Sequence, residues 1–127
     1  MPRQPIATEL APAAIGPYSQ AVRSGTLLFL SGQIPLDPAT GQLVEGDISA
    51  QAQQVFANLD AVCRAAGGSL EQVMRVGIYL LDLADFAAVN AVMASHFSAP
   101  YPARSTIGVS ALPRGARIEV DAILAFD

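Results

Sequence analysis

The sequence has 127 residues, enough for one hydrophobic core and too few for two, so we expect a single domain spanning residues 1–127. A net charge of −4 argues against a nucleic-acid partner, because nucleic-acid-binding proteins draw most of their affinity from basic surface. One cysteine and one histidine exclude a disulfide framework and a Cys/His metal cluster within one chain, and the absence of lysine excludes a Schiff base.

The N-terminal stretch from Met1 to Glu9 lacks the apolar segment of a secretion signal. The longest runs of aliphatic and aromatic residues, Leu27 to Leu30 and Ile78 to Leu81, are far too short to span a bilayer. We therefore expect a cytoplasmic protein with no membrane partner.

The first third of the chain predicts two extended segments. Residues 1–15 are rich in proline and alanine without periodicity, so we expect no regular element there. Gly16-Pro17-Tyr18 indicates a turn into an extended segment around Ser19 to Arg23, and Ser24-Gly25 indicates a tight reversal. The apolar run from Thr26 to Gln33 then predicts a strand.

A helix is predicted next, between Ile48 and Ala66. Its apolar residues recur at helical spacing, at Ala52, Val55, Phe56, Leu59, Val62, Cys63 and Ala66. Asp47 or Ser49 is suited to cap the start of the helix, and Gly67-Gly68 supplies a stop at its end.

A strand and a second helix follow. Ser69 and Gln72 resemble a capping box for one short turn, after which Val73 to Leu81 reads as a strand. The second helix is expected from about Ala84 to Phe97, and the prolines at positions 100 and 102 end it.

The last third predicts two strands, Arg104 to Val109 and Ala116 to Phe126, joined by a turn at Leu112 to Gly115. In the final strand apolar and charged residues alternate, so one face belongs to the core.

The order ββαβ(α)ββ predicts an α+β sandwich with one mixed β-sheet. Two helices cover only one sheet face, while the strands at 26–33 and 73–81 look apolar on both, so we expect a neighbouring subunit to cover the other face.

Two charged residues are candidates for chemistry. Arg104 follows two prolines and enters a short strand, and a guanidinium held rigidly in this way can bind a planar carboxylate through two parallel hydrogen bonds. A structural ion pair is the other interpretation, and it holds for about half of such arginines. Glu119 is either the charged face of an edge strand or part of a polar face that lines a cleft.

The remaining polar candidates are less specific. Tyr18 and the pair Ser31-Gly32 lie beside backbone that glycine lets a ligand approach. His96 lies late in a helix outside any nucleophile pattern, and Cys63 falls on an apolar helix stripe where a thiol is inert. We therefore expect neither a metal nor a cofactor.

Five stretches in a fixed order carry a family resemblance. They are Ala14-Ile15-Gly16-Pro17-Tyr18-Ser19-Gln20-Ala21, Ser31-Gly32-Gln33-Ile34-Pro35, Asn58-Leu59, Pro102-Ala103-Arg104-Ser105 and Leu112-Pro113-Arg114-Gly115-Ala116-Arg117-Ile118-Glu119. Each string alone is a weak signal, whereas their order and spacing are specific and cover nearly the whole chain. By these stretches the sequence resembles the Rid family of imine deaminases, also called YjgF.

The resemblance implies a fold similar to that of the trimeric chorismate mutases, with two helices on one sheet face and clefts between the subunits of a homotrimer. It implies hydrolysis of enamine or imine intermediates such as 2-aminoacrylate to a 2-keto acid and ammonium. By position, Arg104 would bind the substrate carboxylate, Glu119 would orient the attacking water and Tyr18 would close the cleft. Further substrate contacts are implied for Ser31, Gly32, Asn90 and Thr106.

The sequence departs from the family pattern at two positions and leaves other functions open. Thr106 stands where many deaminating members have cysteine, and Met93 where many have tyrosine, so substrate range is the property we expect to differ. A carboxylate-binding regulatory protein is the main alternative. Ribonuclease or translation-inhibitor activity is disfavoured by the acidic charge and lone histidine, and chorismate mutase chemistry by the lack of further cations in the setting of Arg104.

Overall fold

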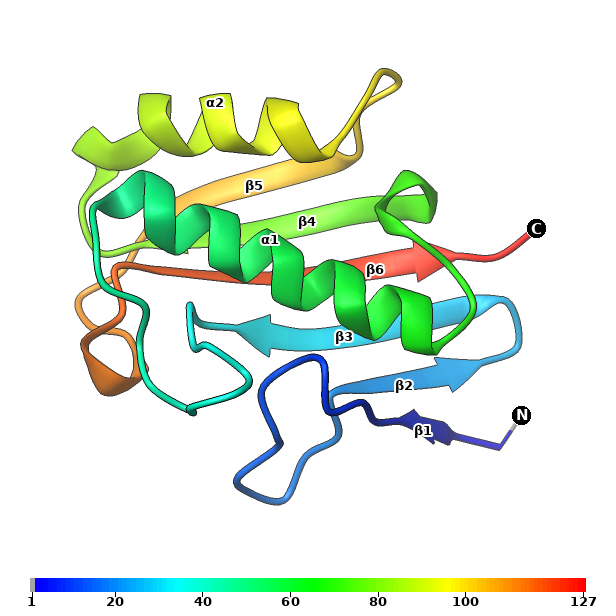
Figure 1. Ribbon diagram of the computed structural model, residues 1–127. Coiled ribbons are helices and arrows are strands. Elements are labelled where there is room, and N and C mark those ends of the chain that lie inside the picture. Colours follow the sequence, from blue (N-terminus) through cyan, green and yellow to red (C-terminus); the bar gives the residue numbers. More distant parts are fainter. Residues whose placement is uncertain (1) are drawn as a thin grey trace.

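The computed structural model describes residues 2–127, which form one six-stranded mixed sheet with two helices on one face (Figure 1). The predicted α+β class and the placement of both helices on one face are confirmed. The sheet order is β1-β2-β3-β6-β4-β5. The elements are β1 (Gln4–Ile6), β2 (Ala21–Ser24), β3 (Leu27–Gln33), α1 (Ile48–Ala65), β4 (Val73–Leu80), α2 (Phe86–His96), β5 (Ala103–Gly108) and β6 (Ile118–Ala125). Within residues 2–127, no helix combines the length and apolar character needed to cross a bilayer.

Strand β1 lies where we expected no regular element, and that prediction was wrong. Its three residues pair antiparallel with β2, with Pro5 opposite Val22. A proline is tolerated there because β1 is an edge strand and needs hydrogen bonds on one side only. Three residues are too few to show an alternation of apolar and polar side chains. The strand forms because it pairs with β2.

Strand β6 runs through the middle of the sheet between β3 and β4. The interpretation of Glu119 as part of an edge strand was therefore wrong. The true edges are β1 and β5, and β5 is parallel to β4, with Arg104 opposite Val76. The strand alternation itself is confirmed, since Ile118, Val120, Ala122 and Leu124 are all buried on the helix side.

Both helices match their predicted bounds to within two residues. Asp47 caps α1 by accepting a hydrogen bond from the Ala50 N–H at 3.0 Å, and the predicted apolar stripe from Ala52 to Cys63 is buried. Helix α2 begins two residues later than expected, because Leu83–Asp85 forms a separate 3-10 turn capped by Asp82. The predicted capping box of Ser69 and Gln72 is present.

The sheet face without helices carries both apolar and polar side chains. Leu27, Phe29 and Ile107 are 41%, 47% and 50% exposed there, which fits the expected apolar surface. Strand β4, however, places Arg75 and Tyr79 on this face, opposite Ile123 and Glu119 of β6, so the expectation that β4 is apolar on both faces was wrong. We call this surface the open face.

Candidate active site

Arg104 lies at the start of β5, where side chains of α2 hold its guanidinium. Its Nη1 donates to Asn90 Oδ1 at 2.5 Å and lies 3.7 Å from Met93 Sδ. The Phe86 ring centre is 5.2 Å from the guanidinium carbon, a cation–π distance. An open cleft of about 370 Å³ adjoins the group, lined by Asn90, Met93, Ala94, Tyr101, Pro102 and Arg104.

Thr106 lies two residues further along β5, so its side chain points to the same sheet face as that of Arg104. Its hydroxyl is buried and has no hydrogen-bond partner within residues 2–127. Thr106 lines a second hollow with Leu83 and Phe86, and this hollow adjoins the guanidinium through Phe86. We call Phe86, Asn90, Met93, Arg104 and Thr106 the Arg104 half-site.

Glu119 lies on the open face, with its carboxylate against the backbone of Gly32. A Cβ atom on Gly32 would overlap Oε2 of Glu119 and lie 2.9 Å from its carboxyl carbon, so only glycine leaves room. Burial raises the pKa of Glu119, and the negative charge of Asp121 raises it further. The carboxylate is thus a better proton acceptor than an exposed glutamate.

The cleft beside Glu119 has a volume of about 320 Å³. Tyr18, Gly32 and Arg114 line it. Ser31 acts differently: its hydroxyl donates to the Ser19 carbonyl at 2.6 Å and so fixes the segment that carries Tyr18. We call Tyr18, Gly32, Arg114 and Glu119 the Glu119 half-site.

The two half-sites of one chain lie on opposite faces of the sheet. Arg104 is the register partner of Val76, which is buried under the helices, whereas Glu119 is the partner of Tyr79 on the open face. Positions three residues apart on β4 point to opposite sides. The structure therefore brings Arg104 and Asn90 together, and Tyr18, Gly32 and Glu119 together, without joining the two groups in one chain.

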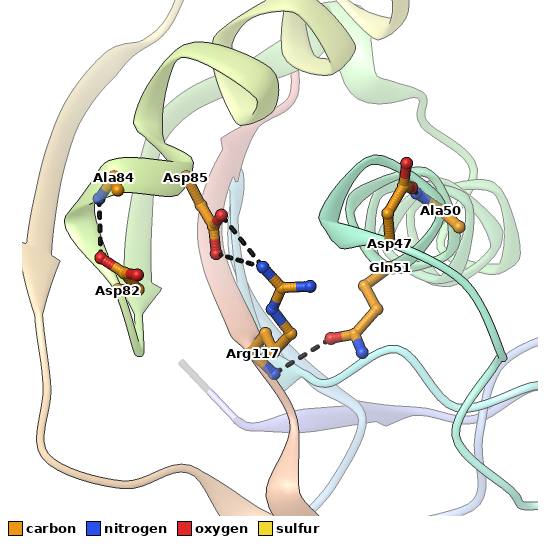
Figure 2. A network of polar contacts seen from close by, with 7 residues as sticks. All are labelled: Asp47, Ala50, Gln51, Asp82, Ala84, Asp85 and Arg117. Carbon is orange, nitrogen blue, oxygen red and sulfur yellow. Dashed lines mark hydrogen bonds and ion pairs between the residues drawn. The ribbon is translucent and has the colours of Figure 1, made fainter.

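A polar network ties the elements that carry the half-sites, and sequence reasoning did not predict it (Figure 2). Arg117, two residues before Glu119, donates through Nη2 to both carboxylate oxygens of Asp85 at 3.0 Å. Its backbone N–H donates to Gln51 Oε1 of α1 at 3.0 Å. Asp85 directly precedes α2, so the start of β6 is fastened to both helices.

Arg114 was also missed as a site residue. It adopts a left-handed conformation with φ of 59° inside the predicted turn, and its Nη1 donates to the Gly41 carbonyl at 2.9 Å. The signal was its place in Leu-Pro-Arg-Gly, five residues before Glu119. The contact with residue 41 joins two loops far apart in sequence, which no local pattern indicates.

His96 and Cys63 lie outside both half-sites. His96 Nε2 hydrogen-bonds with Gln53 Oε1 at 2.6 Å and its ring packs on Phe56, where burial lowers its pKa. Burial raises the pKa of the Cys63 thiol to about 12, so it stays protonated at neutral pH and is a poor nucleophile. Among residues 2–127, no group of three His, Cys, Asp or Glu side chains is placed to hold a metal ion.

Comparison with known proteins places the chain in a family. A family model described as Endoribonuclease L-PSP matches residues 8–126. A protein named 2-iminobutanoate/2-iminopropanoate deaminase, from Dermatophagoides farinae, is 45% identical over 126 residues, which cover 99% of this chain and 98% of that protein.

Two solved structures extend the comparison. RidA from the Antarctic bacterium Psychrobacter sp. PAMC 21119 superposes with a TM-score of 0.95 at 50% identity, covering 98% of this chain and 100% of that one. E. coli TdcF with bound serine gives a TM-score of 0.91 at 37% identity, covering 98% and 99% of the two chains. This chain belongs to the Rid (YjgF) family.

Proposed function

We propose that this protein is a hydrolase that deaminates reactive enamine and imine carboxylates of the 2-aminoacrylate type to 2-keto acids and ammonium. The observation that carries the proposal is the pair of half-sites: a guanidinium braced by Asn90, and a carboxylate whose proton affinity is raised. The named activity of the D. farinae relative supports the same reaction class.

Arg104 binds the substrate carboxylate in this proposal. Its Nη1 is already bonded to Asn90, and within residues 2–127 no hydrogen bond is recorded for its other nitrogens. Nη2 and Nε of a guanidinium lie side by side and match the two oxygens of a carboxylate. Asn90 thus fixes the direction in which the remaining donors point.

Glu119 acts on water. The enamine first tautomerises to the imine, as the terminal carbon of its double bond takes up a proton and the nitrogen gives one up. Water then attacks the imine carbon, Glu119 orients that water and accepts its proton, and the proton passes to the nitrogen to give a carbinolamine. Glu119 next accepts the proton of the new hydroxyl and passes it to the amino group, the carbon–nitrogen bond breaks as the keto group forms, and the departing ammonia takes up a solvent proton to become ammonium. Tyr18 covers the substrate, and the chemistry uses neither metal nor cofactor.

The working site lies between subunits of a homotrimer in our proposal, with the Arg104 half-site of one chain facing the Glu119 half-site of its neighbour. The placement of these half-sites on opposite faces of one chain supports this arrangement. The exposed Leu27 and Phe29 on the open face support burial against another copy. The cytoplasm is the proposed compartment, as the sequence suggested.

A small-carboxylate-binding regulatory protein is the second candidate, favoured by the serine in the TdcF structure. One assay separates the two. A serine/threonine dehydratase generates 2-aminoacrylate in the presence of this protein, and keto-acid formation is followed against the spontaneous rate. Acceleration supports the deaminase; no acceleration by protein that still binds pyruvate supports the regulatory function. Nuclease activity has little support, since His96 lies outside both half-sites.

A further inference from the structure

A polar cluster on the open face lies beside Glu119 and outside the proposed substrate contacts. Tyr79 of β4 donates its hydroxyl to Asp121 Oδ2 of β6 at 3.1 Å. The pair sits over the bare backbone of Gly77, where an added Cβ would lie 2.5 Å from Asp121 Oδ1 and 3.0 Å from the Tyr79 hydroxyl. Glycine at position 77 is therefore what allows this hydrogen bond to form.

The register of the sheet connects the cluster to Glu119. Glu119 and Asp121 are two residues apart on β6, so both side chains stand on the open face. Tyr79 is the direct cross-strand partner of Glu119, and its ring reaches diagonally to Asp121, a span that aromatic side chains cover. Asp121 is thus a like charge fixed close to Glu119.

The other charged and titratable groups near Glu119 and Asp121 include Arg75, whose Nη1 would lie 3.4 Å from a Cβ added at Gly77. Arg75 lies on β4 beside Tyr79, and Tyr18 and Arg114 lie in the walls of the Glu119 cleft. Arg75 donates to the Ser105 hydroxyl at 3.2 Å, and Arg114 is bonded to the Gly41 carbonyl. Within residues 2–127, no cation lies within salt-bridge distance of Glu119 or Asp121.

We infer that Asp121, held by Tyr79 over Gly77, is a positioning residue that makes Glu119 a stronger base for the attacking water. The inference rests on the proposed deamination. The hydrogen bond donated by Tyr79 fixes the Asp121 side chain on the same strand face as Glu119, two residues away. Glu119 is the group that acts on water, and Asp121 acts on Glu119 through its charge. Burial and this donation also raise the pKa of Tyr79, which keeps its hydroxyl a donor.

The test replaces Asp121 by asparagine, which keeps the size of the side chain and its capacity to accept from Tyr79. In Asp121→Asn, Glu119 loses its anionic neighbour and should ionise at lower pH. The midpoint of the Glu119 carboxyl carbon in an NMR titration, and the acid limb of the pH profile of kcat, should both move to lower pH. Glu71→Gln removes an exposed carboxylate from the 3-10 turn before β4 and should leave both unchanged.

A second variant covers the chance that Asp121→Asn folds poorly. Tyr79→Phe removes only the hydroxyl that holds Asp121, so the charge of Asp121 is no longer fixed near Glu119 and the NMR midpoint of the Glu119 carboxyl should fall. Midpoints of Glu119 that match the parent in both variants would overturn the inference. If the parent protein hydrolyses no imine, the proposed function fails by itself, and the NMR midpoints still decide whether Asp121 acts on Glu119.

Discussion

Arg104 and Glu119 are held by two different physical devices. Asn90, Met93 and Phe86 of α2 fix the guanidinium through a hydrogen bond, a sulfur contact and a cation–π contact. The Glu119 carboxylate is instead fixed by the absence of a side chain at Gly32. The first device orients the Arg104 guanidinium, and the second raises the proton affinity of the Glu119 carboxyl by removing it from water.

Substitutions at these two residues should therefore have different effects. Arg104→Ala removes charge-assisted hydrogen bonds worth about 1.5–3 kcal/mol, so pyruvate should bind roughly 10- to 100-fold more weakly. Glu119→Gln keeps the shape of the site and loses the proton acceptor, so pyruvate binding should persist while kcat falls. Calorimetric titration with pyruvate and the dehydratase-coupled assay measure the two effects.

Arg64→Ala is the matched control for lost charge, because Arg64 is exposed on α1 and, among residues 2–127, forms its salt bridge with Asp60. It should bind pyruvate like the parent. Parent-like pyruvate binding by assembled Arg104→Ala, or a parent-like rate in Glu119→Gln, would show that the role assigned to that residue is wrong.

The raised pKa of Glu119 also predicts how stability depends on pH. Below the unfolded pKa of about 4.3, Glu119 is protonated in both states and adds no penalty. As pH rises through the higher folded pKa, the folded state must ionise a half-buried carboxyl, so its stability falls relative to the unfolded state. Glu119→Gln should then have a higher Tm than the parent above that range and a matching Tm below it.

Thermal unfolding from acid to neutral pH checks this, with Glu71→Gln as the exposed control. An equal difference in Tm at every pH would mean that packing, and not ionisation, separates Glu119→Gln from the parent. The same property has opposite effects on stability and on chemistry. Ionising the half-buried Glu119 lowers the stability of the fold, and it also makes the carboxylate a better proton acceptor.

At the scale of elements, the network in Figure 2 connects the start of β6 to α1 and to the start of α2. It thereby fixes the position of β6, which carries Glu119, relative to α2, which carries Asn90. Gln51→Ala removes the acceptor for the Arg117 N–H and should cost about 1–3 kcal/mol in the free energy of unfolding. Asp85→Asn weakens an ion pair whose Arg117 side chain is 41% exposed and should cost at most about 1 kcal/mol.

Urea unfolding at one fixed protein concentration measures both changes, because the stability of the proposed trimer depends on concentration. Gln42→Ala is the control, since its side chain is exposed and the backbone bond of residue 42 to Asp37 is retained. A larger loss in Asp85→Asn than in Gln51→Ala would reverse the assigned order of the two contacts.

The sequence predicted the elements whose own residues define them. Helix α1 was predicted because its stripe has a period and its cap and stop are local. Strand β1 was missed because it depends on β2, about fifteen residues further on, and the central place of β6 was missed because strand order is a long-range property. For the same reason the contact of Arg104 with Asn90 followed from no local pattern: it requires β5 to run parallel to β4 beneath α2.

At the scale of the whole molecule, the proposed shared site predicts complementation between chains that are impaired on their own. A trimer that mixes Arg104→Ala and Glu119→Gln chains contains interfaces where the intact Arg104 of one chain meets the intact Glu119 of the next. Random mixing of equal amounts should create such interfaces at about a quarter of all sites. Co-refolding the two variants should therefore restore about a quarter of the parent rate.

Each variant refolded alone is the control and should keep its own reduced rate. Light scattering should report a trimer for the parent and for the mixture. Trimers that regain no activity on mixing would place Arg104 and Glu119 of one chain in the same site, contrary to their positions on opposite sheet faces.

In the proposed trimer, the opposite placement of the two half-sites makes catalysis subject to mass action. In a folded monomer, Arg104 and Glu119 lie in two separate half-sites, and no site contains both residues. The monomer therefore does not catalyse the reaction. The rate per chain then reports how many chains are assembled and falls steeply on dilution below the dissociation range of the trimer. In that arrangement, protein concentration affects the total rate twice, through the number of chains and through the fraction of them that forms complete interfaces.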